Sequence, residues 1–105
     1  MFGYIYKTTC LRINKIYIGQ HCKFNKNYLG SGSELLKEIK YCKNKNPKNW
    51  RKFFKVEILK YCKNQSQLNN FEKIFIKKFN STNFEIGLNL LTSYKFKNGS
   101  PSKNP

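Results

Sequence analysis

The sequence predicts a small α+β domain in which a three-stranded antiparallel sheet is flanked by helices. Two short aromatic and β-branched runs lie close together near the N-terminus, and a third run in mid-chain alternates apolar and charged residues. Two longer segments repeat apolar residues at helical spacing. With 105 residues, the chain is long enough for one domain with a modest core and too short for two.

The first two strands are expected to form a hairpin. Residues 2–8 and 15–19 are rich in aromatic and β-branched side chains, and a polar loop separates them. With that loop centred between residues 11 and 12, Tyr6 faces Tyr17 across the pair. In this register the two phenols lie about 5 Å apart on one face of the sheet.

A Gly-Ser-Gly segment precedes the first expected helix. Ser31 and Glu34 have the spacing of a capping box, which predicts that the helix begins there and ends within residues 43–47. The expected buried stripe of this helix consists of Leu35, Leu36, Ile39 and Cys42, and its flanks consist of Lys37, Glu38 and Lys40.

A third strand and a second helix follow. Residues 50–53 are expected to form a short helical or turn segment. The strand after it is predicted from the alternating apolar residues Phe54, Val56 and Ile58. Ser66 is expected to cap a helix that runs to about Phe79. The apolar stripe of that helix consists of Leu68, Phe71, Phe75, Ile76 and Phe79.

Two polar side chains interrupt these apolar patterns. Glu72 lies about 40° from the centre of the second helix's stripe. A carboxylate directed toward a core is costly unless it is paired or bound to a metal, so Glu72 is either a ligand or an edge residue that pairs with lysine. Asn89 lies within the apolar run 87–91. We expect it to be buried and hydrogen-bonded, either holding a loop or orienting a site.

The composition is strongly basic, with 21 Lys and Arg against 5 Asp and Glu and a formal charge of +16. Codon bias of an A/T-rich genome explains part of the lysine excess. The rest indicates a polyanionic partner, either nucleic acid or an acidic membrane surface. The lysines are spread over all the expected elements rather than one helix face, which favours nucleic acid. With no aspartate, a multi-carboxylate two-metal site would consume most of the five glutamates. With a single histidine, a His-rich zinc site is excluded.

The remaining features concern the chain's surroundings and its domain limits. The four cysteines form no C-x-x-C pair, so free thiols are expected. No segment resembles a signal peptide or a membrane span, so we expect an intracellular protein that is neither secreted nor inserted in a membrane. Residues 1–94 are expected to form the domain, and residues 95–105 a flexible basic tail.

Several motifs together resemble the GIY-YIG nuclease superfamily. The resemblance rests on Tyr4-Ile5-Tyr6, Tyr17-Ile18-Gly19, the YLGSG segment at 28–32, the helical segment 71–80 and Gly87-Leu88-Asn89-Leu90. Their order and spacing match the family over residues 2–92, and particularly its small phage- and virus-associated, homing-type members. The resemblance implies a three-stranded antiparallel sheet flanked by helices, the same fold that the residue patterns predict.

The resemblance also implies a DNA endonuclease that hydrolyses phosphodiester bonds with one divalent metal ion, Mg²⁺ or Mn²⁺. In that family pattern Tyr17 is the general base, Tyr6 its partner and Glu72 the metal ligand. Asn89 orients the glutamate or the phosphate, and His21 contacts the phosphate or assists the base. A single-metal site suits a chain with so few acids.

One departure from the family pattern concerns the arginine that many relatives carry in the first helix. Lys37 is expected to replace it, with Lys23 and Lys40 as the weaker candidates. Lys37 is thus counted with the catalytic residues, whereas Lys7, Lys23, Lys40 and Arg51 are expected to bind the phosphate backbone of double-stranded DNA. Because lysine lacks the bidentate fork of arginine, an alternative remains open. In that alternative the chain is a catalytically impaired nucleic-acid-binding module on the same scaffold.

Overall fold

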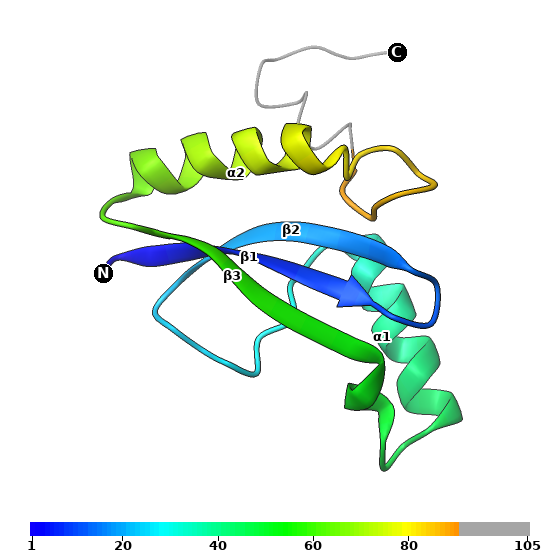
Figure 1. Cartoon of the computed structure of the whole chain (residues 1–105). Helices are drawn as coiled ribbons and strands as arrows, with labels where there is room; N and C mark the ends of the chain where they lie inside the picture. Colours follow the sequence, from blue (N-terminus) through cyan, green and yellow to red (C-terminus); the bar gives the residue numbers. More distant parts are fainter. Residues whose placement is uncertain (91–105) are drawn as a thin grey trace.

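The computed structural model describes residues 1–90, so the predicted boundary at residue 94 and the predicted tail at 95–105 lie outside it. In chain order the elements are β1 (Gly3–Cys10), β2 (Lys15–Cys22), α1 (Ser33–Lys45), the 3₁₀ helix η1 (Trp50–Phe53), β3 (Phe54–Cys62) and α2 (Gln65–Phe79). This is the predicted α+β fold, shown in Figure 1. Within residues 1–90 no helix is long and apolar enough to cross a membrane.

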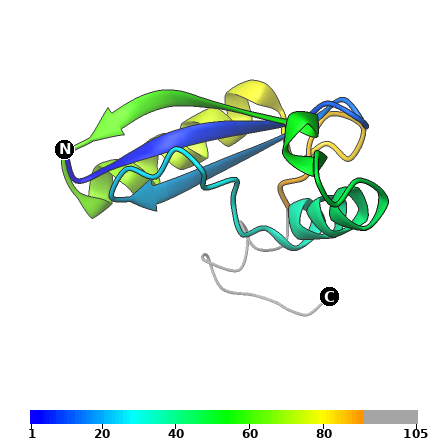
Figure 2. The same cartoon turned by 90° about the horizontal axis from the view of Figure 1, so that it is seen from below.

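The sheet has the strand order β2-β1-β3, and both neighbouring pairs are antiparallel. Helix α2 covers one face, while α1 and the loop before it lie on the other side, as Figures 1 and 2 show. Each side has its own apolar cluster. Ile5 and Ile18 pack with Leu68 of α2, and Cys10 packs with Leu35 of α1. The central strand β1 therefore contributes to both clusters through alternate side chains.

The hairpin register differs from the predicted one. Tyr17 lies opposite Thr8, and Tyr6 lies opposite Gly19. The difference arises because β1 runs two residues further than expected and the turn ends at Asn14, whose φ is 54°. A shift of two residues keeps every side chain on its face, whereas a shift of one would reverse it. Tyr6 and Tyr17 therefore still share a face, with ring centroids 6.3 Å apart.

Both predicted helix caps are wrong. Helix α1 has Gly32 at its N-cap and therefore no side-chain cap bond, while Ser31, one residue earlier, is hydrogen-bonded to Tyr17. Helix α2 is capped by Asn64 rather than Ser66. The Asn64 side chain accepts a hydrogen bond of 2.8 Å from the main-chain N–H three residues further on. The elements themselves were predicted correctly, since apolar spacing rather than capping decides where a helix packs.

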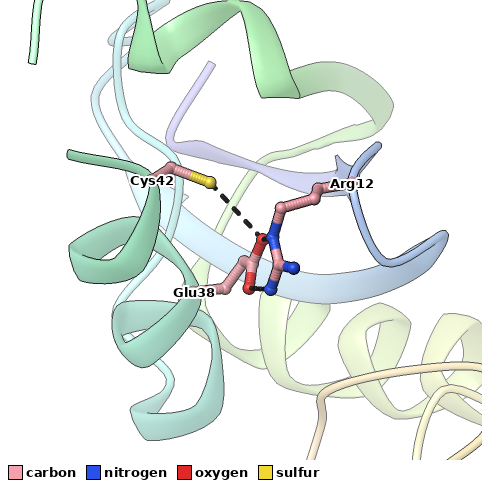
Figure 3. Close-up of polar contacts among 3 residues, drawn as sticks. All are labelled: Arg12, Glu38 and Cys42. Atoms are coloured by element: carbon pink, nitrogen blue, oxygen red, sulfur yellow. Dashed lines mark hydrogen bonds and ion pairs between the residues drawn. The ribbon is translucent and has the colours of Figure 1, made fainter. Parts of the chain in front are cut away.

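The buried side of α1 differs from the predicted stripe at two positions. Its buried apolar residues are Leu35, Ile39 and Cys42. Leu36, predicted to be buried, is 48% exposed, and Glu38, predicted on the flank, is 6% exposed. The Glu38 carboxylate accepts hydrogen bonds from Arg12 Nε at 2.7 Å and Arg12 Nη2 at 2.5 Å. The Cys42 thiol donates to the same carboxylate at 3.4 Å, as Figure 3 shows. The bidentate partner explains how a glutamate is accommodated there.

Replacing Arg12 by methionine is expected to lower the melting temperature by several degrees. The change leaves the Glu38 carboxylate buried without its partner and removes the link between the β1–β2 turn and α1. The double variant Arg12→Met with Glu38→Leu should recover most of the loss, because it removes the buried charge as well. Thermal melts followed by circular dichroism measure both changes. A matched control is Lys37→Met, which breaks the exposed pair with Glu34 and should change little.

The four cysteines, all within the described residues, are free. Cys10, Cys42 and Cys62 are buried and Cys22 is exposed. Burial, with the Glu38 carboxylate nearby, raises the pKa of Cys10 to about 12. The buried thiols are therefore protonated packing groups at neutral pH.

Candidate active site

Two tyrosines from neighbouring strands converge over a glycine. Tyr6 of β1 and Tyr17 of β2 lie on the face that carries α1, with their ring planes inclined at 41°. A Cβ on Gly19 would overlap the Tyr6 hydroxyl and lie 3.0 Å from Cε2 of Tyr17. The glycine of the YIG tripeptide is thus required by the close approach of both rings, and any larger residue would displace them.

The loop before α1 closes around the other side of Tyr17. A Cβ on Gly32 would overlap the Tyr17 ring, and one on Gly30 would lie 2.9 Å from it. Gly30 also has a φ of +130°, which L-residues rarely adopt. The Ser31 hydroxyl and the Gly32 N–H donate hydrogen bonds to the Tyr17 hydroxyl. The GSG segment therefore positions Tyr17 at the N-terminus of α1, where main-chain N–H groups favour a negative charge.

Tyr28 and His21 pack beside Tyr6 and Tyr17, and these four side chains form the tyrosine cluster. The His21 ring stacks on Tyr28 with centroids 3.9 Å apart, and Tyr28 meets Tyr6 edge to face at 5.7 Å. The Tyr6 hydroxyl donates to the Tyr28 hydroxyl. His21 shares the face of Tyr17, as predicted, because the two residues are an even number apart on one strand. Tyr28 was missed as a site residue, although it begins the segment whose glycines pack on Tyr17.

Glu72 approaches the tyrosines from the second helix. It is half-buried on α2, and its Oε1 accepts a hydrogen bond of 3.0 Å from Nε2 of Gln20 on the edge strand β2. Its negative charge is among the causes that raise the pKa of both Tyr6 and Tyr17. None of the ion pairs within residues 1–90 includes Glu72. In the described part of the chain, Glu72 therefore does not form the lysine pair that was the predicted alternative to a metal-ligand role.

The two phenols differ in how readily they ionise. Tyr6 is 1% exposed, and burial, followed by the neighbouring tyrosines and Glu72, raises its pKa far above the ordinary value. Burial and then Glu72 also raise the pKa of Tyr17, but the hydrogen bonds from Ser31 and Gly32 act in the opposite direction. Tyr6 is thus suited to donate a hydrogen bond. Tyr17 is the better placed of the two to lose its proton.

Asn89 fixes the strand that carries Tyr17. Its Oδ1 accepts a hydrogen bond from the Ile18 N–H and its Nδ2 donates to the Ile18 carbonyl, both at 2.8 Å. Two main-chain bonds join Ile16 to residues 86–88 beside it. Because β2 is an edge strand, these contacts satisfy main-chain groups that have no strand partner. The half-buried Asn89 side chain is therefore bound to the main chain of Ile18, where it holds the edge strand in place.

The two arginines have separate surroundings. Arg12 is bound to Glu38, whereas Arg51 of η1 donates from Nη2 to the Asn27 carbonyl at 2.9 Å. Asn27 directly precedes Tyr28 in the loop that closes the site. A guanidinium therefore lies beside the tyrosine cluster's loop even though α1 carries no arginine. Only the tertiary fold brings Arg51 to this place.

The predicted phosphate-binding lysines are dispersed. Lys37 forms a 2.9 Å ion pair with Glu34 in α1, and its side chain is 73% exposed. Lys7 lies on the α2 face of the sheet, over the Phe79 ring and 3.2 Å from Glu57. The exposed lysines Lys23 and Lys40 lie at the end of β2 and on α1. The structure therefore does not bring these four lysines together, and Lys7 lies on the face opposite the tyrosines.

The side chains near Glu72 fit the divalent ion that the resemblance implies. Within residues 1–90 no group of three or more His, Cys, Asp or Glu side chains could hold a metal. A hard cation such as Mg²⁺ is commonly held by one or two carboxylates, with water and substrate phosphate completing its coordination. Glu72 supplies one such carboxylate, held by Gln20 of the strand that carries Tyr17. The donor set is therefore that of a single-carboxylate site that needs the substrate to complete it.

Comparison with known proteins agrees with this geometry. The family model of the GIY-YIG catalytic domain matches residues 2–85, which is most of the chain. No curated protein and no solved structure gives a significant match. The match includes both strands of the tyrosine pair, the GSG loop and Glu72. The chain therefore belongs to the GIY-YIG catalytic-domain family, which makes it a nuclease domain by descent.

Proposed function

We propose that the chain is a metal-dependent DNA endonuclease in which Tyr17 is the general base and Glu72 the ligand of one divalent ion. The observation that carries the proposal is the position of the Tyr17 hydroxyl. It packs against Gly32 at the N-terminus of α1, where Ser31 and Gly32 donate to it, and the Glu72 carboxylate, held by Gln20 of the same strand, acts on it through its charge. A base beside a metal-binding carboxylate is what hydrolysis of a phosphodiester requires.

The roles of the individual groups follow from their surroundings. The donors on Ser31 and Gly32 stabilise Tyr17 as a phenolate, and its Oη then takes the proton of the attacking water and becomes a neutral phenol. Tyr6 stays protonated and orders the cluster through its bond to Tyr28. His21, stacked on that ring, is positioned to contact the phosphate. A divalent ion on Glu72 would offset the carboxylate charge that raises the pKa of Tyr17 and would stabilise the charge of the scissile phosphate.

The net charge of +16 supports a nucleic-acid substrate. Arg51 lies beside the loop of the tyrosine cluster and Lys37 lies exposed on α1, so both are candidates for the phosphate contact that an arginine makes in many relatives. Contacts of this kind are to phosphate and carry no sequence information. We therefore propose backbone binding that weakens steeply as the salt concentration rises.

A plasmid-nicking assay with and without metal tests the proposal. Supercoiled DNA should be nicked in Mg²⁺ or Mn²⁺, and excess EDTA should reduce nicking to background while DNA binding persists. Binding is measured separately by fluorescence anisotropy at several salt concentrations. If the protein binds DNA with the expected salt dependence but never nicks it in either metal, the binding-module alternative is correct and the endonuclease proposal is wrong.

A further inference from the structure

We propose that a pocket beside the tyrosine cluster binds an unpaired nucleobase of the substrate. This inference rests on the proposed function and narrows the substrate class to DNA that has an unpaired nucleotide near the scissile phosphate. The pocket has a volume of about 100 Å³ and lies between β1, β3 and the loop that follows β2. Its lining residues are Tyr4, Phe24, Asn25, Lys26, Val56 and Ile58.

The chemistry of the walls suits a flat group with polar edges. Val56 and Ile58 supply apolar surface from β3, and the Phe24 ring supplies an aromatic surface from the loop. Asn25 and Lys26 supply an amide and a cation at the same loop. A nucleobase has an apolar π-face and hydrogen-bonding edges, and in a strand it is attached to a phosphate that a lysine can contact.

Exposed aromatic rings flank the buried ring of Tyr4. Phe24 is 53% exposed and 5.8 Å from Tyr4 between centroids. Tyr61 is 55% exposed, lies opposite Tyr4 in the sheet register and is 6.5 Å from it. Large exposed aromatic side chains that gather at one place usually mark a binding surface. Aromatic rings on a basic protein are the usual platform on which single-stranded bases stack.

The pocket adjoins the proposed catalytic site through the Tyr4 ring. The Tyr4 ring meets His21 edge to face at 6.0 Å and lies 6.1 Å from the Tyr6 ring. The Tyr4 hydroxyl donates to the Asn25 carbonyl at 3.2 Å and accepts from the Asn25 N–H at 3.3 Å. This pair of bonds holds the loop that carries Phe24 against the sheet. A base in the pocket is therefore separated from Tyr6 by a single ring.

The charge distribution favours a nucleotide over an apolar peptide or a lipid. None of the five glutamates lines the pocket, whereas Lys26 does and the exposed Lys23 lies just before Phe24. The bases of an intact duplex are stacked inside the helix and cannot enter such a pocket without being flipped out. An unpaired or mismatched base has the lowest cost of leaving the stack, so DNA that contains one is the preferred substrate class.

Anisotropy titrations in EDTA, where no cleavage occurs, test the inference with three labelled DNAs. These are a blunt duplex, the same duplex with one unpaired nucleotide, and that second DNA with an abasic site in place of the unpaired base. The wild-type protein should bind the second about tenfold more tightly than the first or the third. Phe24→Ala should remove this preference without weakening duplex binding, and Phe24→Trp should retain it. Because Phe24 is exposed, neither variant should unfold the chain.

The matched control is Phe84→Ala, which removes a ring that is 75% exposed, lies over Lys15 and does not line this pocket. It should keep the full preference. Equal wild-type affinity for the three DNAs, or a Phe24→Ala loss that is the same for all three, would overturn the inference. If the protein nicks plasmid but binds the three DNAs equally, the endonuclease proposal is supported and the base-binding inference is wrong. If the protein prefers the DNA with an unpaired base but does not nick plasmid, the base-binding inference is supported and the endonuclease proposal is wrong.

Discussion

Replacing Glu72 by glutamine is expected to reduce metal-dependent nicking at least about 100-fold, to near background. Groups that only orient a metal ligand already contribute about 10- to 100-fold to metal affinity or activity, so the ligand itself should contribute more. No neighbouring carboxylate can compensate, because the described residues contain no cluster of potential metal ligands around Glu72. Glutamine preserves the size of the side chain. The measurement is the single-turnover nicking rate across a Mn²⁺ titration.

Binding and fold provide the controls for this variant. DNA affinity in EDTA should stay the same or rise slightly, since one negative charge is removed from a basic protein. Glu85→Gln removes the same charge from an exposed residue in the segment after α2 and should retain wild-type nicking. If Glu72→Gln nicked DNA at the wild-type rate throughout the Mn²⁺ titration, Glu72 would be excluded as the metal ligand.

Replacing Tyr17 by phenylalanine is expected to reduce the nicking rate by about 10²- to 10⁴-fold, the usual contribution of a general base. The wild-type rate should rise with pH between neutral and mildly alkaline values. Tyr17 acts in its deprotonated form and its pKa is raised. At pH values below that pKa, each increase of one pH unit therefore raises the deprotonated, active fraction about tenfold. In Tyr17→Phe this rise should disappear. Rates measured from pH 6.5 to 9 in saturating Mg²⁺ give both results.

Tyr41→Phe is the matched control for the lost hydroxyl. Tyr41 is exposed on α1, and its ring contacts Arg12 and Lys45 through its face, which phenylalanine preserves. Its pH profile should match that of the wild type. A Tyr17→Phe variant that keeps both the rate and the pH dependence would show that the water loses its proton elsewhere, and Tyr17 would then be only a packing residue for the GSG loop.

The tyrosine pair illustrates how far the sequence alone could predict this site. Alternating residues placed Tyr6, Tyr17 and His21 on one face, and that assignment remained correct although the register was wrong by two residues. The period of a strand is two, so an even shift moves partners along the sheet without exchanging faces. An even shift of register does, however, change which residues are in contact. Tyr6 and Tyr17 were predicted to lie directly opposite each other, but they meet diagonally across Gly19.

Glu38 and Glu72 show the limit of helical periodicity. The pattern placed Glu38 on the wet flank and Glu72 within the apolar stripe, yet Glu38 is the more deeply buried of the two. Periodicity gives the direction of a side chain from the helix axis, but burial depends on what the fold brings against it. Arg12, far away in the sequence, supplies the partner that makes the burial of Glu38 possible.

The sequence by itself predicted the strands, the helices and the basic character, because these follow from local spacing and composition, and its family resemblance named the two tyrosines and the glutamate as candidate site residues. The tertiary structure alone decided that Ser31 and Gly32 donate to Tyr17, that Tyr28 and Arg51 border the site and that Asn89 holds Ile18. Each of these contacts joins residues from different elements. Such contacts depend on how the elements pack, and no local pattern records that packing.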